Sequence, residues 1–340
     1  MEESVTEPCN TVGSRYEALK ARGMSLDMSR GKPGPDQLNL VSPMLNVLTP
    51  DDYCSESGVD CRNYGGVNGI PEIRRIFADI LDAPVSGVIA AGNSSLNLMF
   101  DRISRCFTHG VNGSEPWQNQ RGVKFVCPTP GYDRHFLICE YFNIQMVSIE
   151  MTETGPDMDA AEALIQSDPL VKGMWCVPVY SNPTGCVYSD ETVLRLARLK
   201  PKAPDFRLFW DNAYCVHNFN ETRPVIPNII RECAINGAAD MPLVFVSFSK
   251  VSFPGAAVSA VAASDNNIKN ILKEMNPQTI GPDKINQLRH ARFFKNADGV
   301  YRHMEKLAKL VKPKFDVVLS ALEAELSGLA HWSKPNGGYF

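Results

Sequence analysis

The sequence lacks the features that define several large classes of protein. Its 34 Lys and Arg residues nearly balance its 38 Asp and Glu residues, so the formal net charge is only −4. This balance excludes the strongly basic character of a dedicated nucleic-acid binder. No stretch approaches the roughly 20 apolar residues that a membrane-spanning helix needs. The acidic, polar start MEES does not resemble a secretory signal. We therefore predict a globular cytoplasmic protein with no nucleic-acid or membrane partner.

Metal-binding and disulfide patterns are also missing, although the chain has ten cysteines and six histidines. No two cysteines form a Cys-x-x-Cys pair, and no two histidines have His-x-x-x-His spacing. A chain of 340 residues with 44% hydrophobic residues needs no disulfides to stabilise its core. We predict reduced cysteines that pack as small core side chains, such as Cys127 and Cys176, and no metal site.

The middle of the sequence contains short apolar runs that are rich in β-branched residues. Such runs are typical of strands buried on both faces of a mostly parallel sheet. They cover residues 85–91, 123–127, 144–149, 174–179, 208–210, 243–246 and 258–262. Amphipathic helical patterns lie between several of them and begin near Pro71, Ser95 and Asp190. This alternation of strand and helix predicts a layered α/β domain.

The two ends of the sequence differ from its middle. Residues 1–45 are polar, and the stretch GKPGP at residues 31–35 predicts a turn or an extended loop. From Ala297 to about Leu329 the pattern is helical, with a kink or break expected at Pro313. Residues 335–340 resemble a turn followed by the start of a strand. Because a domain rarely ends there, we expect a C-terminal portion beyond this sequence.

Four polar motifs follow predicted strands, where open α/β sheets hold their ligands. They are GNSS at residues 92–95, SNPTG at 181–185, WDNAY at 210–214 and SFSK at 247–250. Taken singly, each has an ordinary explanation as a helix cap, a tight turn or a solvated loop. The first also places hydroxyl groups at a helix N-terminus, which suits an anion. Together, their fixed order at successive strand ends favours one shared site.

This ordered set resembles the fold-type-I pyridoxal-phosphate enzymes, specifically the class I/II aminotransferases. Tyr64, in NYGGVNG at residues 63–69, and Tyr132, in PGY at 130–132, add two further matches. The resemblance covers about residues 30–340. Within the family, the sequence looks closest to the aspartate aminotransferase branch that is similar to the aminotransferase-like part of certain bacterial regulators.

The resemblance implies a fold and a division into domains. A three-layer α/β large domain with a mostly parallel sheet would bind pyridoxal 5′-phosphate and occupy residues 49–296. A smaller α+β domain would come from the two chain ends, residues 1–48 and 297–340, and would be incomplete. Residues 297–340 would supply the helix that links the domains and the start of the truncated C-terminal part.

The resemblance also assigns roles to individual residues. Lys250 would form the Schiff base with pyridoxal 5′-phosphate and shuttle the substrate proton, because a lysine amine loses its proton readily when it is desolvated. Asp211 would keep the ring nitrogen of the cofactor protonated. Tyr214 and Asn182 would bind its phenolic oxygen, and Tyr132 would stack on its ring.

The remaining predicted residues would hold the phosphate group. Hydroxyl and backbone N–H groups would come from Ser94, Ser95, Ser247 and Ser249. Tyr64 would reach the phosphate of the neighbouring subunit, which implies a homodimer with shared active sites.

Three departures from the family pattern concern positive charge. The family places an arginine eight positions after the lysine, where it pairs with the phosphate, but this sequence has Val258. The family also binds the substrate α-carboxylate with an arginine in the C-terminal domain, whereas the last arginine here is Arg302. Candidates for binding a second substrate carboxylate are Arg30, Lys32 and Arg289, by position only.

The leading interpretation is an aminotransferase that moves an amino group from L-aspartate or L-glutamate to 2-oxoglutarate by a ping-pong route. Two other reactions, those of a lyase and of a decarboxylase, would use the same Lys250 and Asp211. A non-catalytic regulator that binds the cofactor is a further alternative, although the 45 residues before the first motif contain no winged-helix pattern. A dinucleotide-binding protein is set aside because no Gly-x-Gly-x-x-Gly follows the first strand.

Overall fold

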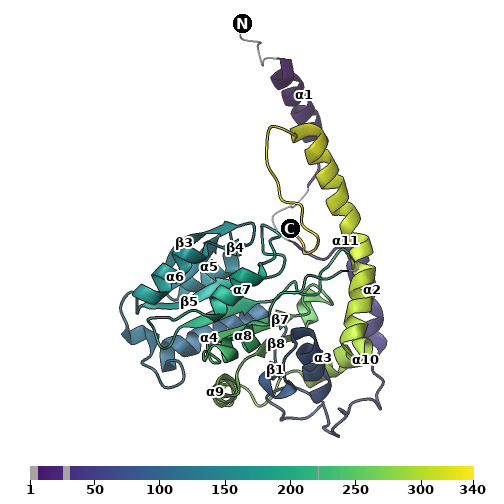
Figure 1. Cartoon of the computed structure of the whole chain (residues 1–340). Coiled ribbons are helices and arrows are strands. Elements are labelled where there is room, and N and C mark those ends of the chain that lie inside the picture. Colours follow the sequence, from purple (N-terminus) through teal and green to yellow (C-terminus); the bar gives the residue numbers. More distant parts are fainter. Residues whose placement is uncertain (1–6, 26–30, 221) are drawn as a thin grey trace. The chain divides into compact units, whose positions relative to one another are not determined.

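The computed structural model describes residues 7–25, 31–220 and 222–340. The chain divides into two compact units, residues 1–32 and 33–340. In the first unit, the described structure is the helix α1 (Glu7–Ala21) and the short segment after it. The second unit contains the sheet and the other helices (Figure 1). The domain boundaries predicted near residues 48 and 296 stay a prediction.

The second unit is built on one sheet of eight strands, in the order β1-β8-β7-β6-β5-β2-β3-β4. The strands are β1 (Val88–Ala90), β2 (Lys124–Thr129), β3 (Gln145–Thr152), β4 (Gly155–Pro156), β5 (Val171–Cys176), β6 (Arg207–Asp211), β7 (Pro242–Ser247) and β8 (Ser259–Ala262). The central strands β7, β6, β5, β2 and β3 are parallel to one another. Antiparallel strands close both edges. The predicted α/β class with a mostly parallel sheet is confirmed.

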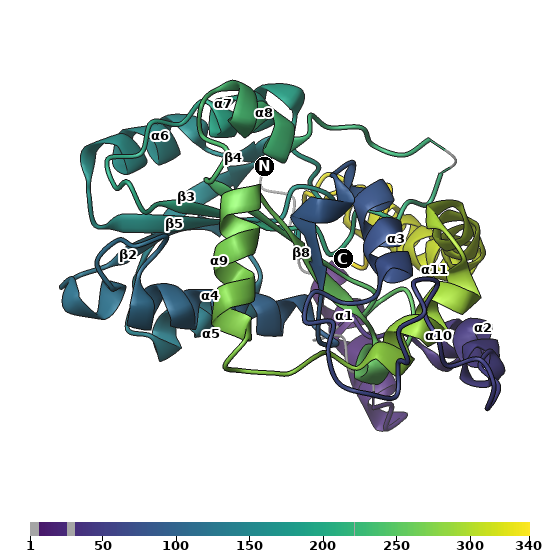
Figure 2. The same cartoon turned by 90° about the horizontal axis from the view of Figure 1, so that it is seen from below.

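Helices cover both faces of this sheet. The helices of the second unit are α2 (Pro35–Val41), α3 (Pro71–Leu81), α4 (Ser95–His109), α5 (Asp133–Tyr141), α6 (Met158–Ser167), α7 (Asp190–Ala197), α8 (Ile229–Ile235), α9 (Asp265–Met275), α10 (Lys284–Phe294) and α11 (Ala297–Leu326). Figure 2 shows α6, α7 and α8 on one side of the sheet and α4 and α5 on the other. Short 3₁₀ turns are η1 (Ser42–Asn46), η2 (Val85–Gly87), η3 (Trp117–Asn119) and η4 (Pro254–Ala256).

Successive side chains along a strand point to opposite faces of the sheet, so an unbroken apolar run makes both faces apolar. In β6, Leu208 and Trp210 belong to the core that includes α6, α7 and α8. Phe209, between them, belongs to the opposite core with α4, α5 and α9. All three side chains are buried. The continuous apolar runs in the sequence therefore reflect burial on both sides, as expected for parallel strands.

Every predicted strand differs from the observed one at one or both ends, and two of these differences have a clear cause. The first is only Val88–Ala90, because residues 85–87 form the turn η2, where Arg74 donates to the carbonyl of Val85. The run predicted at 174–179 is a strand over Val171–Cys176. Pro178 has no N–H group to continue a hydrogen-bonded ladder. Residues 177–179 instead enter the loop that leads to the SNPTG motif.

The C-terminal helix is more continuous than the sequence suggests. Of the kink or break expected at Pro313, the break is wrong, since α11 continues from Ala297 to Leu326 with this proline inside it, and the kink stays a prediction. Proline removes the N–H that would bind the carbonyl of Lys309, and that exposed residue leaves its carbonyl open to water. The expected start of a strand at residues 339–340 is also wrong. Only an isolated bridge between Asn218 and Gly337 forms in this part of the described chain.

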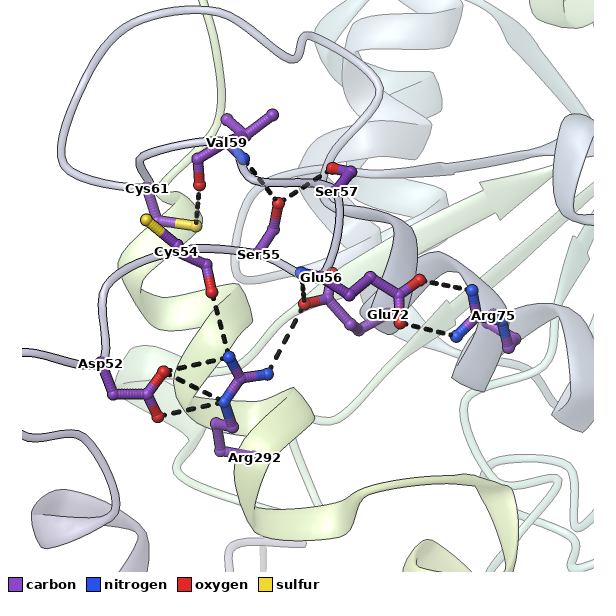
Figure 3. Close-up of polar contacts among 10 residues, drawn as sticks. All are labelled: Asp52, Cys54, Ser55, Glu56, Ser57, Val59, Cys61, Glu72, Arg75 and Arg292. Atoms are coloured by element: carbon purple, nitrogen blue, oxygen red, sulfur yellow. Dashed lines mark hydrogen bonds and ion pairs between the residues drawn. The ribbon is translucent and has the colours of Figure 1, made fainter.

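Arg292 links the loop before α3 to its own helix, α10, and to the start of α3 (Figure 3). Its guanidinium binds the carboxylate of Asp52 at 3.0 Å and the carbonyl of Cys54 at 3.0 Å. It also lies 3.6 Å from the Glu72 carboxylate in the first turn of α3. Glu72 in turn accepts the backbone N–H of Glu56 at 2.6 Å. These contacts fix the start of the loop that carries Tyr64.

Two expectations about composition can be compared with the structure. The nine cysteines from Cys54 to Cys233 are free, and Cys127 and Cys176 are buried in the core. Among the described residues, we find no helix with the length and apolar character that a membrane crossing requires.

A buried ion pair provides a test of the fold. Asp205, just before β6, accepts from Lys172 of β5 at 2.7 Å and from the indole of Trp117 at 2.8 Å. The Lys172 and Asp205 side chains are only 5% and 3% exposed. We expect Asp205→Ala to lower the free energy of unfolding by about 3–5 kcal/mol, because it leaves a buried ammonium without a partner. Urea unfolding measures this loss.

The matched control is Asp316→Ala, which breaks the exposed pair between Lys312 and Asp316 on α11. Exposed pairs of this kind contribute about 0.5 kcal/mol or less. Equal, small losses in the two variants would contradict the structural role given to Asp205.

Candidate active site

A cavity of about 130 Å³ lies where the central parallel strands end. Nine of the ten residues predicted from the sequence line it: Ser94, Ser95, Tyr132, Asn182, Asp211, Tyr214, Ser247, Ser249 and Lys250. Asp211 is the last residue of β6 and Ser247 the last residue of β7. The parallel alignment of the strands therefore brings together motifs that are far apart in the sequence.

Asp211 is the buried anion of the cavity. Its carboxylate is 4% exposed, and Oδ2 lies 3.0 Å from Nε2 of His135 on α5. The His135 ring stacks on the indole of Trp175, with ring centres 4.3 Å apart and planes 8° apart. The other oxygen, Oδ1, is buried and has no hydrogen-bond partner among the described residues. One half of the carboxylate is thus fixed, and the other half is open to a donor in the cavity.

Lys250 is the cation of the cavity, in the loop that follows β7. Its Nζ lies 4.9 Å from the ring centre of Tyr214. Burial lowers the pKa of the Lys250 ammonium, and the negative charge of Asp211 partly opposes this shift. The neutral amine, which is the nucleophilic and proton-accepting form, is therefore more accessible than for a lysine in water.

Tyr214 and Asn182 form the wall next to Lys250. Burial raises the pKa of the Tyr214 hydroxyl well above its usual value, and the charge of Asp211 raises it further. A hydrogen bond with the Asn182 side chain acts in the opposite direction. The phenol therefore stays protonated at neutral pH and can donate a hydrogen bond into the cavity.

Hydroxyl groups gather at the end of the cavity beside α4. Ser94 is the N-cap residue of this helix and Ser95 is its first residue. The hydroxyl of Ser247 donates to that of Ser249 at 3.0 Å, and Ser249 donates to the carbonyl of Asn93 at 3.3 Å. Free backbone N–H groups and the dipole at a helix N-terminus favour an anion at this end.

The structure does not bring Tyr64 into this cavity. Its side chain is 79% exposed, on the loop between α2 and α3. Its predicted role requires a second subunit and stays a prediction. Val258, which stands where the family has an arginine, is buried next to β8. Arg30 lies outside the described residues, and Lys32 lies in the other compact unit. Arg289 does not line the cavity.

Two histidines near the site were missed by the sequence reasoning. His135 follows the PGY motif by three residues, so its place on the first turn of α5 was the available signal. His217 is buried behind the lysine loop, with Nε2 3.4 Å from the Lys250 carbonyl. Its signal was weaker, because only the three-residue spacing from Tyr214 links it to a motif.

The last described residues cover one wall of the site. Gly338 donates its N–H to the carbonyl of His217 at 2.8 Å. The Phe340 ring meets the Tyr214 ring edge to face, with centres 5.9 Å apart. A side chain on Gly185 of the SNPTG motif would lie 2.6 Å from Pro335, so the close approach requires glycine here.

The cavity matches the polar groups of pyridoxal 5′-phosphate. The unpartnered Oδ1 of Asp211 suits the protonated ring nitrogen, which is a donor. The amine of Lys250 suits the aldehyde, and the hydroxyl cluster at the α4 N-terminus suits the phosphate. The residues present therefore fit the polar groups of this cofactor, with hydroxyl groups but no second cation in the lining at the phosphate end.

His217 provides a test by pH. Burial lowers the pKa of its imidazole to about 3, against about 6.5 for an unfolded chain. Below pH 6.5 the unfolded state binds a proton that the folded state does not. The contribution of His217 to the free energy of unfolding should thus fall by about 1.4 kcal/mol per pH unit as the pH drops from 6.5. Urea unfolding at pH 7, 6 and 5 should show a shallower pH dependence for His217→Gln, and parallel curves would contradict the assignment.

Comparisons with known proteins agree with this geometry. The family model described as "Aspartate amino-transferase" matches residues 2–340. A putative aminotransferase of Mycolicibacterium smegmatis is 47% identical over 330 residues, which are 96% of this chain and 77% of that protein. The crystal structure of an aspartate transaminase from Corynebacterium glutamicum has a TM-score of 0.94 at 42% identity and covers 97% of this chain and 78% of that one.

A more distant structure has the same fold. The α-aminoadipate aminotransferase LysN of Thermus thermophilus, in complex with N-(5′-phosphopyridoxyl)-L-leucine, has a TM-score of 0.72 at 19% identity. It covers 91% of this chain and 74% of that one. Aminotransferases of this fold depend on pyridoxal 5′-phosphate. The chain belongs to the aspartate aminotransferase family, within the fold-type-I aminotransferases.

Proposed function

We propose that this chain catalyses transamination between L-aspartate or L-glutamate and 2-oxoglutarate in the cytoplasm, with Lys250 as the residue that bonds the cofactor. The observation that carries this proposal is the placement of the Lys250 amine and the half-satisfied Asp211 carboxylate in one cavity at the strand ends. When bound, pyridoxal 5′-phosphate supplies an aldehyde that reacts with amines and a ring that accepts the electron pair of a broken C–H bond.

Lys250 has two tasks in this proposal. Its Nζ would hold the cofactor through the aldehyde, and as a free amine it would accept a proton from the substrate α-carbon and donate it back on the cofactor side. Burial favours the neutral form of this amine, since it lowers the Lys250 pKa. The loop after β7 and the packing of Tyr214 hold the amine in place.

The other residues orient and tune the site. Asp211, supported by His135, accepts the ring N–H through Oδ1 and balances its positive charge. Tyr214 and Asn182 bind the phenolic oxygen, and Tyr132 covers one face of the ring. The serine hydroxyls at the α4 N-terminus bind the phosphate. Each role follows the placement of these side chains around the cavity.

We also propose a homodimer with shared active sites. The support is the loop of Tyr64, whose aromatic ring is 79% exposed although the start of the loop is anchored by Arg292. An exposed ring on an anchored loop suits a contact with a second subunit. In that dimer, the Tyr64 hydroxyl reaches the phosphate in the neighbouring subunit.

Replacement of Lys250 tests the central role. We expect Lys250→Ala to lose the visible absorption band that arises from the bond between Lys250 and the cofactor. Transamination should fall at least about 10³-fold, because the substitution removes both this bond and the group that carries the substrate proton. The measurement is the absorption spectrum with pyridoxal 5′-phosphate, before and after addition of L-aspartate. Lys269→Ala, at an exposed lysine of α9, is the control. An unchanged spectrum in Lys250→Ala would overturn the assignment.

The products decide between transamination and the alternative reactions. With L-aspartate and 2-oxoglutarate, transamination yields L-glutamate and oxaloacetate. Formation of pyruvate and ammonia without L-glutamate would indicate a lyase. Carbon dioxide and a shortened amine would indicate a decarboxylase.

Asp211→Asn tests the carboxylate at nearly constant volume. We expect transamination to fall by about 10²–10³-fold, because the amide cannot balance the charge of a protonated ring nitrogen. Removal of the Asp211 charge also removes the interaction that raises the Lys250 pKa, so the pKa of the amine should fall further. The pH dependence of the rate at which the apoprotein reacts with pyridoxal measures this shift, and a profile displaced to higher pH would contradict it.

A further inference from the structure

The cavity lacks the positive charge that a phosphate group requires. Among the described residues that line it, Lys250 is the cation and Asp211 is the anion, so their charges cancel. A phosphate monoester brings about −1.5 to −2 charges at neutral pH. The hydroxyl groups of Ser94, Ser95 and Ser249 are neutral, and Val258 is apolar. A cation from outside the cavity lining would complete the balance.

Arg289 on α10 is a cation with unused hydrogen-bonding capacity. Its Nη2 donates to the side-chain carbonyl of Asn286 at 2.5 Å. Its Nε is buried and has no hydrogen-bond partner in the described part of the chain. Within that part, no carboxylate lies at ion-pair distance from its guanidinium. A buried guanidinium donor without a partner is costly and indicates a missing acceptor.

Asn286 connects this guanidinium to the turn before β8. The Asn286 amide donates to the carbonyl of Ala257 at 2.9 Å. Ala257 directly precedes Val258, the position that has no cation. Arg289 is therefore attached, through one side chain, to the turn where the positive charge is missing.

The same turn lies beside the hydroxyl cluster. The N–H of Ser259 donates to the carbonyl of Gly92 at 3.1 Å, and its hydroxyl donates to the carbonyl of Ala91 at 2.6 Å. Ala91 and Gly92 are separated from Ser94, at the start of α4, only by Asn93. The turn at 257–259 therefore joins the Arg289–Asn286 pair to the phosphate end of the cavity.

Lys284, at the start of α10, is a buried cation on the same helix. Its Nζ donates to the carbonyl of Gly65 at 2.7 Å, and its side chain packs against Gly66. Its ammonium is thus engaged by the loop that carries Tyr64. Arg289 is the better candidate, since it contacts the turn at Ala257 through Asn286.

We propose that Arg289, positioned by Asn286, supplies the cation for the phosphate group of the cofactor in place of the arginine that position 258 lacks. This inference rests on the proposed function and assigns Arg289 to the cofactor rather than to a substrate carboxylate. The guanidinium donates to a phosphate oxygen, and Asn286 keeps it next to the turn at 257–259. Arginine suits this task because its planar group matches phosphate geometry.

The experiment compares two ligands that differ only in the phosphate group. Dissociation constants of pyridoxal 5′-phosphate and of pyridoxal are measured by absorption titration of the full-length apoprotein. We expect Arg289→Gln to weaken binding of pyridoxal 5′-phosphate by about 10- to 100-fold, the value of a charge-assisted hydrogen bond. Pyridoxal should bind within about twofold of the unchanged protein, because the Lys250 end is intact. This retained binding also demonstrates that the variant is folded.

Three variants serve as comparisons. Arg121→Gln removes the same charge at an exposed turn before β2 and should leave both constants unchanged. Arg289→Lys keeps the charge and should retain part of the preference for the phosphorylated ligand. Lys284→Gln tests the competing cation.

The outcomes separate this inference from the proposed function. If the unchanged protein binds neither ligand, the proposed function fails and the inference fails with it. If it binds pyridoxal 5′-phosphate and Arg289→Gln binds it equally well, only the inference is overturned. Equal weakening of both ligands would assign Arg289 a structural role and would also overturn it. The inference is also overturned if Lys284→Gln alone loses the preference for pyridoxal 5′-phosphate over pyridoxal, or if Arg289→Gln changes only the KM for L-aspartate.

Discussion

The site depends on one electrostatic arrangement, the Lys250 ammonium and the Asp211 carboxylate in one cavity at the strand ends. Each charge would be costly in isolation, and together they offset one another while each keeps free capacity. His135 satisfies one carboxylate oxygen and leaves the other without a partner. Burial lowers the Lys250 pKa, and the negative charge of Asp211 limits that shift. The balance gives a reactive amine beside a carboxylate that can bind a cationic ring.

The fold makes this arrangement possible because parallel strands end at a common edge. Asp211 ends β6, Ser247 ends β7, and the loop with Asn182 follows β5. The strand interiors are apolar on both faces, so they fix the register rigidly while the strand ends are free to carry polar groups. His135 belongs to the same design. It approaches from α5, and its stacking on Trp175 of β5 fixes the plane of its ring.

The sequence was sufficient to predict those parts that depend on local pattern. The α/β class, most strands and nine residues of the cavity follow from apolar runs and from the motifs behind them. The rest depended on tertiary packing. His217 contacts the Lys250 loop only because the segment after Asp211 folds back. Pro313 remains within α11 because its surroundings are exposed, and no local rule separates that case from a helix break.

Position 258 illustrates how the absence of an expected arginine can be informative. A valine there is compatible with the fold, since its side chain is buried beside β8. The charge that a phosphate needs is not tied to one strand, however, because any element that packs on the same turn can provide it. Helix α10 packs there through Asn286, and its Arg289 has a buried donor without an acceptor. One phosphate group would explain both the unpartnered Nε donor of Arg289 and the missing positive charge of the cavity.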